Sequence, residues 1–337
     1  MRPAADDAET TPSPSRRTLG RSGLQVSPIC LGGNVFGWTV DRKTTFGLLD
    51  AWLDAGMNFV DTADSYSRWV PGNCGGESEE MIGDWLAESG KRHRVVLATK
   101  VGSDMGAGKI DLSAPYIERA VDASLRRLRT DHIDLYQSHW DDPETPLVET
   151  LEAYSRLMQA GKIRAIGASN LTPGRLAEAV QVSGDNGLSC YASLQAHYNL
   201  CERGLYEGEL EDVCIQANIN VLPYYSLASG FLTGKYRNQS DAAISKRGAA
   251  ATRYLNGQGT RILSALDTAA TEHSATASQV ALAWLATRPG VASPIASATS
   301  IEQLEELVRS TRLTLSPETL EKLDRASTPI DRQENAA

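Results

Sequence analysis

The 337-residue chain lacks any apolar run that approaches the about 18 residues of a bilayer-spanning helix. Its N-terminus also lacks the basic-then-apolar layout of a secretory signal. Basic charge is in deficit, because 33 Lys and Arg residues stand against 42 Asp and Glu residues, a formal net charge of -9. An acidic chain does not carry the electrostatic footprint of a general nucleic-acid binder. These absences predict a protein with no membrane segment and no nucleic-acid partner.

Three further patterns are missing, and each would have pointed to a particular kind of site. The five cysteines form no CxxC pair, which fits reduced thiols and predicts a cytoplasmic protein. The five histidines show no HxxxH or HxH spacing, so we expect no metal site and rank a metal hydrolase low. No G-x-G-x-x-G follows an apolar run, so a Rossmann fingerprint is absent.

What the chain does have is enough apolar material for a large core, with 41% hydrophobic and 22% charged residues. The first stretch, MRPAADDAETTPSPS, is polar and rich in proline, which predicts a disordered tail over residues 1–15. No later stretch is rich enough in Gly, Ser or Pro to divide the rest of the chain. Residues 16–330 are therefore predicted to form a single domain, with a flexible C-terminus over 331–337.

Short apolar runs and helical patterns alternate along this domain. Two short strands around a Gly-containing turn come first and predict a hairpin from Arg17 to Val26. Eight β-rich runs follow, namely SPICLGG, MNFVDTA, RVVLATK, HIDLYQSHW, IRAIGASN, YASLQAHYN, INVLPYYSL and VASPIAS. Several are nearly continuous in apolar residues, as parallel strands covered on both faces should be. The pattern predicts an α/β fold, a (β/α)8 TIM barrel with a short N-terminal β-hairpin.

Helices are expected between the strands. Apolar residues recur on one helical face in 46–53, 81–86, 117–128 and 147–157, with further helices around 176–180, 210–214 and 280–285. Near the C-terminus, SPETLEKL has Ser316 as a cap and Pro317 at the first helical position. The polar, Ala-rich segment from Tyr236 to Tyr254 predicts a long loop with helical pieces on the active-site face.

Chemically able side chains stand at consecutive strand ends, which is where the active residues of such barrels lie. The second run ends in Asp61, with Tyr66 a short loop later, and the third and fourth end in Lys100 and His139. These groups suit carbonyl reduction, in which carbon takes a hydride and oxygen takes a proton. The Lys100 ammonium would lower the pKa of Tyr66 from its reference value of about 10. Taken singly, each residue has an ordinary structural role, and only their joint placement predicts a site.

The motifs FVDTADSY, LATK, QSHW, IGASN, LQAHYN and YYSLASGFLTGKY, in this order and spacing, resemble the aldo-keto reductase superfamily over nearly the whole chain after the tail. The resemblance implies a catalytic tetrad of Asp61, Tyr66, Lys100 and His139. Tyr66 would be the general acid and base, and Lys100 the partner that lowers its pKa. Asp61 would support Lys100, and His139 would orient the carbonyl oxygen.

The resemblance also implies a binding site for the nicotinamide half of a dinucleotide. Ser169, Asn170 and Gln195 would hold the carboxamide, and Tyr224 would stack on the nicotinamide ring. Gly33, at the end of the first run, is included in the expected coenzyme site.

Small residues and positive charge are expected around the pyrophosphate. The segment that resembles the covering loop of the family contains Leu227, Ser229, Gly230, Leu232 and Lys235. Arg247 matches an Arg that some members place near the phosphates, and a solvated surface Arg is the alternative interpretation.

The adenosine end is expected near the C-terminus, where PIASATSIEQLEEL resembles the corresponding family segment. The expected contacts there are Ser297, Thr299, Gln303 and Glu306. Many relatives carry a basic residue in this segment for the 2′-phosphate, and this chain has none at these positions. The resemblance implies NADP(H) as the preferred coenzyme, with NAD(H) as the alternative.

The substrate side is expected to be aromatic. Asn34, Trp38, Trp69 and Trp140 fall at the end of the first run or in the loops after the first, second and fourth, where they would form a wall for a small-molecule carbonyl or alcohol. Aromatic aldehydes, sugar-like carbonyls and bulkier cyclic ketones stay open as substrates.

The leading hypothesis is an NADP(H)-dependent oxidoreductase that interconverts an aldehyde or ketone and its alcohol, with Tyr66 as proton donor and acceptor. The alternative is a cofactor-binding regulatory subunit of a membrane protein complex, because one branch of the superfamily resembles cofactor-sensing partners of ion channels. The sequence leaves the oligomeric state and the physiological direction open.

Overall fold

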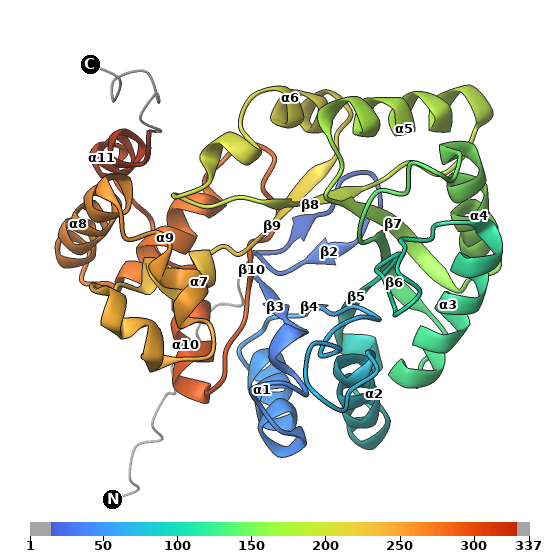
Figure 1. Cartoon of the computed structure of the whole chain (residues 1–337), viewed down its shortest axis with the longest axis horizontal. Coiled ribbons are helices and arrows are strands. Elements are labelled where there is room, and N and C mark those ends of the chain that lie inside the picture. The colour runs from blue at the N-terminus through green and yellow to red at the C-terminus, as the bar shows by residue number, and fades with distance from the viewer. Residues whose placement is uncertain (1–14, 329–337) are drawn as a thin grey trace, which may run out of the picture.

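The computed structural model describes residues 15–328, so the predicted tail and the predicted flexible C-terminus lie outside the described residues apart from Ser15. Eight parallel strands pair in the order β10-β3-β4-β5-β6-β7-β8-β9 (Figure 1). They are β3 (Cys30–Gly32), β4 (Phe59–Asp61), β5 (Val96–Val101), β6 (Ile133–Ser138), β7 (Ile163–Ser169), β8 (Ser193–His197), β9 (Asn220–Tyr224) and β10 (Ile295–Ala296). A parallel bridge between Val221 and Val291 joins β9 to the segment before β10. Each predicted run contains one strand, and the predicted barrel is confirmed.

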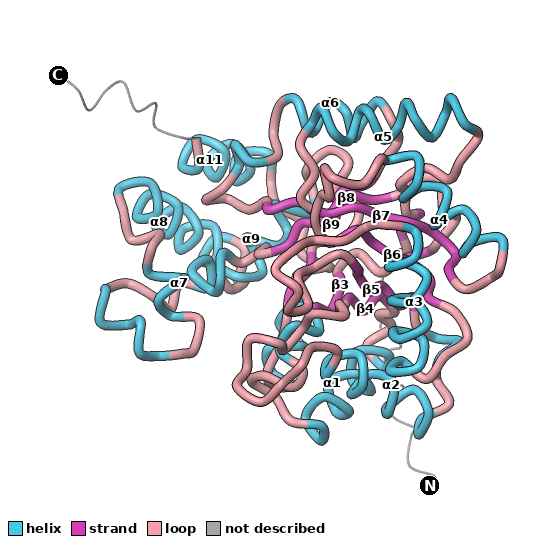
Figure 2. The backbone as a smooth tube through the Cα atoms, turned by 45° about the vertical axis from the view of Figure 1, so that its right-hand side comes forward, coloured by secondary structure: helices cyan, strands magenta, loops and turns pink. Residues whose placement is uncertain are grey.

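Helices surround this sheet (Figures 1 and 2). They are α1 (Arg42–Asp54), α2 (Glu77–Ser89), α3 (Ala114–Leu128), α4 (Leu147–Gln159), α5 (Pro173–Asn186), α6 (Glu209–Gln216), α7 (Gly248–Thr252), α8 (Gly257–Glu272), α9 (Ala277–Ala286), α10 (Ile301–Ser310) and α11 (Pro317–Ser327). The predicted helices are confirmed, whereas α8 and α10 were not expected. The segment from Tyr236 to Tyr254 contains a short 3-10 helix, Gln239–Ile244, and α7, as predicted.

Several helices begin at side chains that satisfy backbone N–H groups left open at a helix start. The Ser316 side chain accepts a hydrogen bond from Thr319 N, and a proline follows in the first turn of α11, as predicted. At α9, Thr276 and Gln279 cap each other's backbone reciprocally. The start of the unexpected α8 is fixed in the same way, because the Asn256 side chain accepts from Gly259 N.

Two apolar cores hold the barrel. The larger core contains the apolar faces of the helices and includes Trp52, Trp85 and Trp284. The smaller core contains Cys30, Phe59, Ala98, Leu135, Ala165 and Leu222 from successive strands, together with Leu19 and Val26 from the N-terminal segment. Each fully buried aliphatic or aromatic side chain contributes about 1.5–3 kcal/mol, so both cores are needed to offset the entropy of ordering the chain.

The hairpin made by β1 (Arg17–Thr18) and β2 (Gln25–Val26) is confirmed, and the two strands pair antiparallel. It lies at the amino ends of the barrel strands: the Arg17 guanidinium donates to Val291 O and Ala292 O, and Gly20 N donates to Asn220 Oδ1. Because Leu19 and Val26 are fully buried in the smaller core, the hairpin closes that end of the barrel. The carboxyl ends of the strands remain for a site.

Candidate active site

A cavity of about 770 Å³ lies at the carboxyl ends of the strands. Most of the predicted site residues line it: Asp61, Tyr66, His139, Ser169, Asn170, Gln195, Tyr224, Leu227, Ser229, Gly230, Lys235, Arg247, Ser297, Gln303, Glu306, Asn34, Trp69 and Trp140. Lys100 lies buried beside the lining, in contact with Asp61 and Tyr66. Gly33, Trp38 and Thr299 are not part of the lining.

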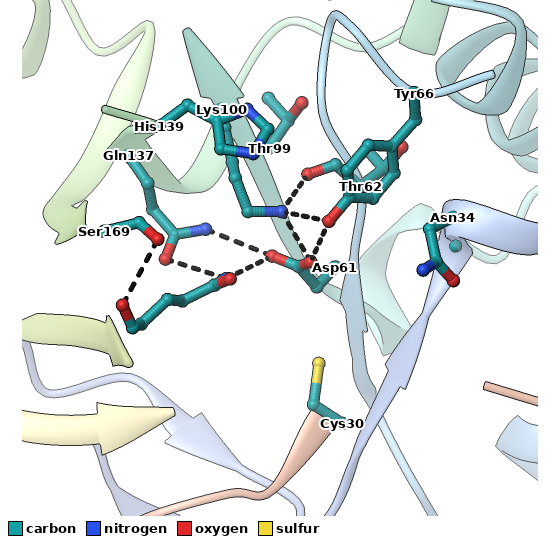
Figure 3. Close-up of polar contacts among 12 residues, drawn as sticks. Cys30, Asn34, Asp61, Thr62, Tyr66, Thr99, Lys100, Gln137, His139 and Ser169 are labelled. Atoms are coloured by element: carbon teal, nitrogen blue, oxygen red, sulfur yellow. Dashed lines mark hydrogen bonds and ion pairs between the residues drawn. The ribbon is translucent and has the colours of Figure 1, made fainter. Parts of the chain in front are cut away.

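Lys100 is the centre of a buried cluster (Figure 3). Its Nζ donates to Asp61 Oδ2 at 2.6 Å, to Tyr66 Oη at 2.8 Å and to Thr62 O at 2.8 Å. Lys100 and Asp61 are each only 1% exposed, so the ion pair is shielded from water and its geometry is fixed by full hydrogen bonding. The strands set these positions, because β4 ends at Asp61 and β5 pairs beside it.

The charges of this cluster decide its protonation. Burial works to lower the pKa of Lys100, but Asp61 and Tyr66 outweigh it and raise that pKa to about 12. Burial raises the pKa of Tyr66 to about 12, and the Lys100 ammonium opposes the rise. The effect of Lys100 on the pKa of Tyr66 therefore has the expected direction. Burial has the larger effect, so the pKa of Tyr66 rises, whereas the sequence predicts that it falls. At neutral pH Lys100 is therefore an ammonium and Tyr66 a neutral phenol.

His139 follows β6 and lies beside Tyr66, with ring centroids 6.0 Å apart. Its Nδ1 is 2.8 Å from Ser103 Oγ and 3.4 Å from Ser65 Oγ. Burial, and after it the charge of Lys100, holds the pKa of His139 well below 6.5, so the ring is neutral. When the Ser103 hydroxyl donates to Nδ1, the ring proton lies on Nε2, which makes that atom a hydrogen-bond donor.

The residues expected around the nicotinamide lie together at the ends of β7, β8 and β9. Asn170 has a left-handed backbone with φ 58, and its Nδ2 donates to His139 O at 2.9 Å and to Ser169 Oγ at 3.1 Å. Its Oδ1 accepts from Tyr224 Oη at 2.7 Å. Ser169 Oγ donates to Gln195 O at 3.2 Å. Three strands therefore place amide and hydroxyl groups around one end of the cavity.

The next part of the cavity is shaped for anions. Ala228, Ser229 and Gly230 have successive positive φ values of 47, 58 and 96, and in this turn Ala228 N donates to Tyr225 O at 2.7 Å and Gly230 N donates to Leu227 O at 2.8 Å. A Cβ added at Gly230 would lie 3.7 Å from Lys235 Nζ, so this ammonium stands directly over the turn. Lys235 forms no ion pair with another residue of 15–328. Positive charge and the small residues Ser229 and Gly230 thus line the same space.

Arg247 reaches the cavity from the long insertion after β9. Its Nη2 donates to Asn34 Oδ1 at 3.2 Å, and its guanidinium lies 5.3 Å from the Trp38 ring centroid. Asn34 Oδ1 also accepts from Ser297 Oγ at 2.7 Å. Burial lowers the pKa of Arg247, and no carboxylate of the described chain pairs with it. A half-buried, unpaired guanidinium favours an anionic ligand.

The expected adenosine end is neutral or acidic. Gln303 Oε1 accepts from Thr299 N at 2.9 Å and from Thr299 Oγ1 at 3.1 Å. The Glu306 carboxylate accepts from the hydroxyls of Thr276 and Ser278 at the start of α9. Gln303 and Glu306 both line the cavity, and neither carries a positive charge. Lys235 and Arg247 line the same cavity but come from an earlier segment of the chain.

The substrate side has an aromatic rim. Trp69 is 51% exposed, Trp140 is 44% exposed and Tyr225 is 48% exposed, and all three line the cavity. Trp38 lies behind this rim, edge-on to Trp69 with ring centroids 5.6 Å apart. Trp38 therefore supports the wall from behind and does not form part of it.

Sequence reasoning missed several residues of the cavity. Arg68, Ser103, Asp104 and Tyr225 line it from the loops after β4, β5 and β9. The sequence gives little indication of their role, because loop residues of these types are ordinarily solvated. Gln137 is not part of the lining but bonds Asp61 and Gln195, and it was missed as well. A polar residue inside the apolar run HIDLYQSHW could have indicated a role in the site.

A membrane-spanning helix and a group of metal ligands are both absent from the described residues. No helix within 15–328 has the length and apolar character to cross a membrane. In the same part of the chain, His, Cys, Asp and Glu side chains form no group of three or more that could hold a metal ion.

Comparisons with known proteins cover nearly the whole chain. The model of the Aldo/keto reductase family matches residues 28–328. Uncharacterized oxidoreductase YrpG of Bacillus subtilis is 35% identical over 315 residues, which span 91% of this chain and 94% of that protein. Aldo-keto reductase YhdN of Bacillus subtilis is 33% identical, over 89% of this chain and 90% of that protein. A probable voltage-gated potassium channel subunit beta of Oryza sativa is 32% identical, over 91% of this chain and 95% of that protein.

Proposed function

Since the chain belongs to the aldo/keto reductase family, a family of NAD(P)H-dependent oxidoreductases, we propose that it interconverts an aldehyde or ketone and the corresponding alcohol, with Tyr66 as the proton donor in reduction. One observation carries the proposal. The Lys100 ammonium lies 2.8 Å from Tyr66 Oη and 2.6 Å from Asp61 Oδ2 in a buried cluster beside the cavity.

The residues of the chain have separate tasks in this reaction. NAD(P)H, when bound, supplies the hydride to the carbonyl carbon. Tyr66 Oη gives its proton to the carbonyl oxygen as charge develops there, and the adjacent Lys100 ammonium stabilises the phenolate that remains. His139 donates through Nε2 to the same oxygen and orients the carbonyl. Asp61 holds Lys100 in place, and in alcohol oxidation the phenolate of Tyr66 takes the proton back.

The lining of the cavity supports a dinucleotide as the coenzyme. The small residues Ser229 and Gly230 leave room for a pyrophosphate, and Lys235 and Arg247 in the same lining supply the positive charge that balances it. The amide oxygens of Asn170 and Gln195, which also line the cavity, can accept from the N–H groups of a nicotinamide carboxamide. The chain's own residues therefore fit the coenzyme of the family.

We infer NADP(H) as the preferred coenzyme and NAD(H) as a usable one. The hydroxyl and amide groups of Thr299 and Gln303 can hydrogen-bond a 2′-phosphate, but they carry no charge. The preference is therefore modest, because a neutral hydrogen bond contributes about 0.5–1.5 kcal/mol and a charged one about 1.5–3 kcal/mol.

The decisive experiment is a kinetic screen of aldehydes, ketones and alcohols with NADPH and NADH, repeated with Tyr66→Phe. The substitution is expected to lower turnover by about 10²- to 10⁴-fold, the usual contribution of a positioned general acid. The dissociation constant of the dinucleotide should stay unchanged, because the hydroxyl that is removed bonds Lys100 and Asp61, and phenylalanine keeps the ring that lines the cavity. Unchanged turnover in Tyr66→Phe would refute the proton-donor assignment.

Tyr206→Phe is the matched control. It removes a buried hydroxyl that has no hydrogen-bond partner among the described residues and that lies outside the cavity lining. Its turnover should equal that of the unsubstituted chain. We do not propose the regulatory-subunit alternative, because the match to the aldo/keto reductase family supports an oxidoreductase.

A further inference from the structure

Three polar side chains meet inside the barrel where apolar ones usually lie. Barrel interiors are filled in layers contributed by alternate strands, mostly with bulky branched residues. Here β4, β6 and β8, which alternate in the strand order, contribute Asp61, Gln137 and Gln195. These residues are 1%, 0% and 2% exposed, respectively. A buried polar layer is costly unless its members satisfy one another.

Gln137 satisfies both of its neighbours (Figure 3). Its Nε2 donates to Asp61 Oδ1 at 3.1 Å, and its Oε1 accepts from Gln195 Nε2 at 3.1 Å. Gln195 Nε2 also donates to Asp61 Oδ1, at 2.6 Å. The three side chains therefore form a closed ring of hydrogen bonds.

The backbone beside Gln137 leaves room for this ring. Gly167 pairs with Gln137 across β6 and β7. A Cβ at position 167 would lie 3.0 Å from Gln137 Cγ and 2.6 Å from Ser193 Oγ. Only glycine at this position leaves the Gln137 side chain in its place.

The ring divides the two oxygens of Asp61 between two functions. Oδ2 faces the proton-donating side and accepts from Lys100 Nζ. Oδ1 accepts from the two amides. Both hydrogens of Gln195 Nε2 are used within the ring, which leaves Gln195 Oε1 as the acceptor on a residue that lines the cavity.

We propose that Gln137 is a positioning residue that fixes the Gln195 amide, with Oε1 as its available acceptor for a nicotinamide carboxamide, and at the same time holds the Asp61 carboxylate that supports Lys100. The inference rests on the proposed function, because it assigns Gln195 to the nicotinamide. Gln137 itself touches neither coenzyme nor substrate. It links Gln195, which would bind the nicotinamide, to Asp61, which supports Lys100 beside the proton donor.

Binding measurements with Gln137→Met test the inference without requiring turnover. Methionine keeps the length of the side chain and removes both hydrogen bonds of Gln137, so the Gln195 amide keeps only its bond to Asp61 Oδ1 and is less firmly held. The dissociation constant of NADP⁺ should rise by up to about tenfold, the upper part of the net contribution of one hydrogen bond. The dissociation constant of 2′-phospho-ADP-ribose, which lacks nicotinamide, should stay the same. A general loss of structure would weaken both nucleotides alike.

Ser193→Ala is the control variant, on the same strand as Gln195. Ser193 pairs with Gly167 on the next strand, is fully buried and has no hydrogen-bond partner for its hydroxyl among the described residues. Its ratio of the two dissociation constants should match that of the unsubstituted chain.

Gln137→Glu supplies a readout that a purely structural role would not move. A protonated glutamic acid has the shape of glutamine and can donate to Asp61 Oδ1, whereas the ionised form repels that carboxylate. The discrimination between NADP⁺ and 2′-phospho-ADP-ribose should therefore be restored as pH falls toward 5 and lost toward pH 9.

Each outcome has one meaning. An unchanged ratio of dissociation constants in Gln137→Met, or an equal rise for both nucleotides, overturns the role of Gln137 while the proposed function stands. If the unsubstituted chain itself binds NADP⁺ no more tightly than 2′-phospho-ADP-ribose, the nicotinamide assignment is wrong, and the proposed function and the inference fall together.

Discussion

At the scale of single residues, the site is a balance between burial and pairing. Lys100 and Tyr66 share one carboxylate oxygen, Asp61 Oδ2, at 2.6 Å and 3.4 Å. Burial favours the neutral form of the phenol, while the nearby ammonium favours the phenolate. The result is a phenol that holds its proton at neutral pH and gives it up only when an oxyanion develops next to it, which suits a general acid.

Carbonyl reduction should keep a constant kcat from about pH 6.5 to about pH 10. Burial raises the pKa of Tyr66 to about 12 against the opposing effect of Lys100. The active protonated phenol is thus fully present at neutral pH and is lost only as pH rises through that pKa. On the acid side, burial holds the pKa of His139 well below 6.5, so the neutral ring persists. We expect a plateau when kcat is measured at saturating substrate between about pH 6.5 and about pH 10, and a half-titration between about pH 7 and 9 would contradict it.

At the scale of elements, close contact between neighbouring helices and strands fixes where the loops begin. α2 and α3 approach so closely that a Cβ at Gly83 would lie 2.0 Å from Arg127 O and 2.8 Å from Leu128 Cα. Both atoms belong to the backbone of α3 and its end, so they cannot rotate away. The loop that carries Tyr66 leads directly into α2, and the helix contact therefore bears on the position of the site.

Gly83→Ala should destabilise the protein, although alanine in a helix interior is ordinarily favoured over glycine by about 0.8–1.0 kcal/mol. The added methyl group would overpack the α2–α3 contact, which typically costs about 1–3 kcal/mol. Gly184→Ala in α5 is the matched control, because a Cβ there meets no atom within 4 Å. The free energy of unfolding, measured with urea, should fall in Gly83→Ala and rise in Gly184→Ala. Equal gains would show that the two helices are not in close contact.

How far the sequence predicts these elements depends on the strength of the local signal. All eight barrel strands follow from apolar runs, and α11 follows from Ser316 and Pro317. α8 was missed because Gly257 and Gly259 stand in its first turn, where two glycines argue against a helix, although Ile262 and Leu263 lie on its buried face.

The same limit applies to the site. Asp61, Lys100 and His139 lie at the ends of β4, β5 and β6, because these positions depend on strand order alone, and their catalytic roles stay predictions. Whether Trp38 or Trp69 faces the cavity depends on loop conformation, which no periodicity encodes. The net pKa shift of Tyr66 depends on burial in the folded protein. The sequence therefore predicts the lowering of this pKa by Lys100 but not the larger rise that burial causes.

At the scale of the whole molecule, the two ends of the barrel carry different tasks. The cavity lies at the carboxyl ends of the strands, and the hairpin closes the amino ends. In such barrels, residues at the amino ends contribute to stability and those at the carboxyl ends to chemistry. Stability and turnover should therefore respond separately to substitution.

Leu19→Ala should lower the free energy of unfolding by about 2–5 kcal/mol, because it opens a cavity in the smaller core. Leu19 is fully buried there, whereas its neighbour Leu24 is only partly buried, so Leu24→Ala should cost less. The kcat of the folded Leu19→Ala protein should equal that of the unsubstituted chain. Denaturant unfolding and kinetics at low temperature provide both numbers, and a large fall in kcat would contradict the separation of the two ends.

The position of the hairpin has a practical consequence for handling the protein on surfaces. The Arg16 guanidinium donates to Gly56 O and Asn58 Oδ1 beside the hairpin, so the chain enters the barrel at the end opposite the cavity mouth. Attachment of the protein to an electrode or resin through its N-terminus would turn the closed end toward the support. The mouth would then face the solution, where coenzyme and reactants diffuse without obstruction.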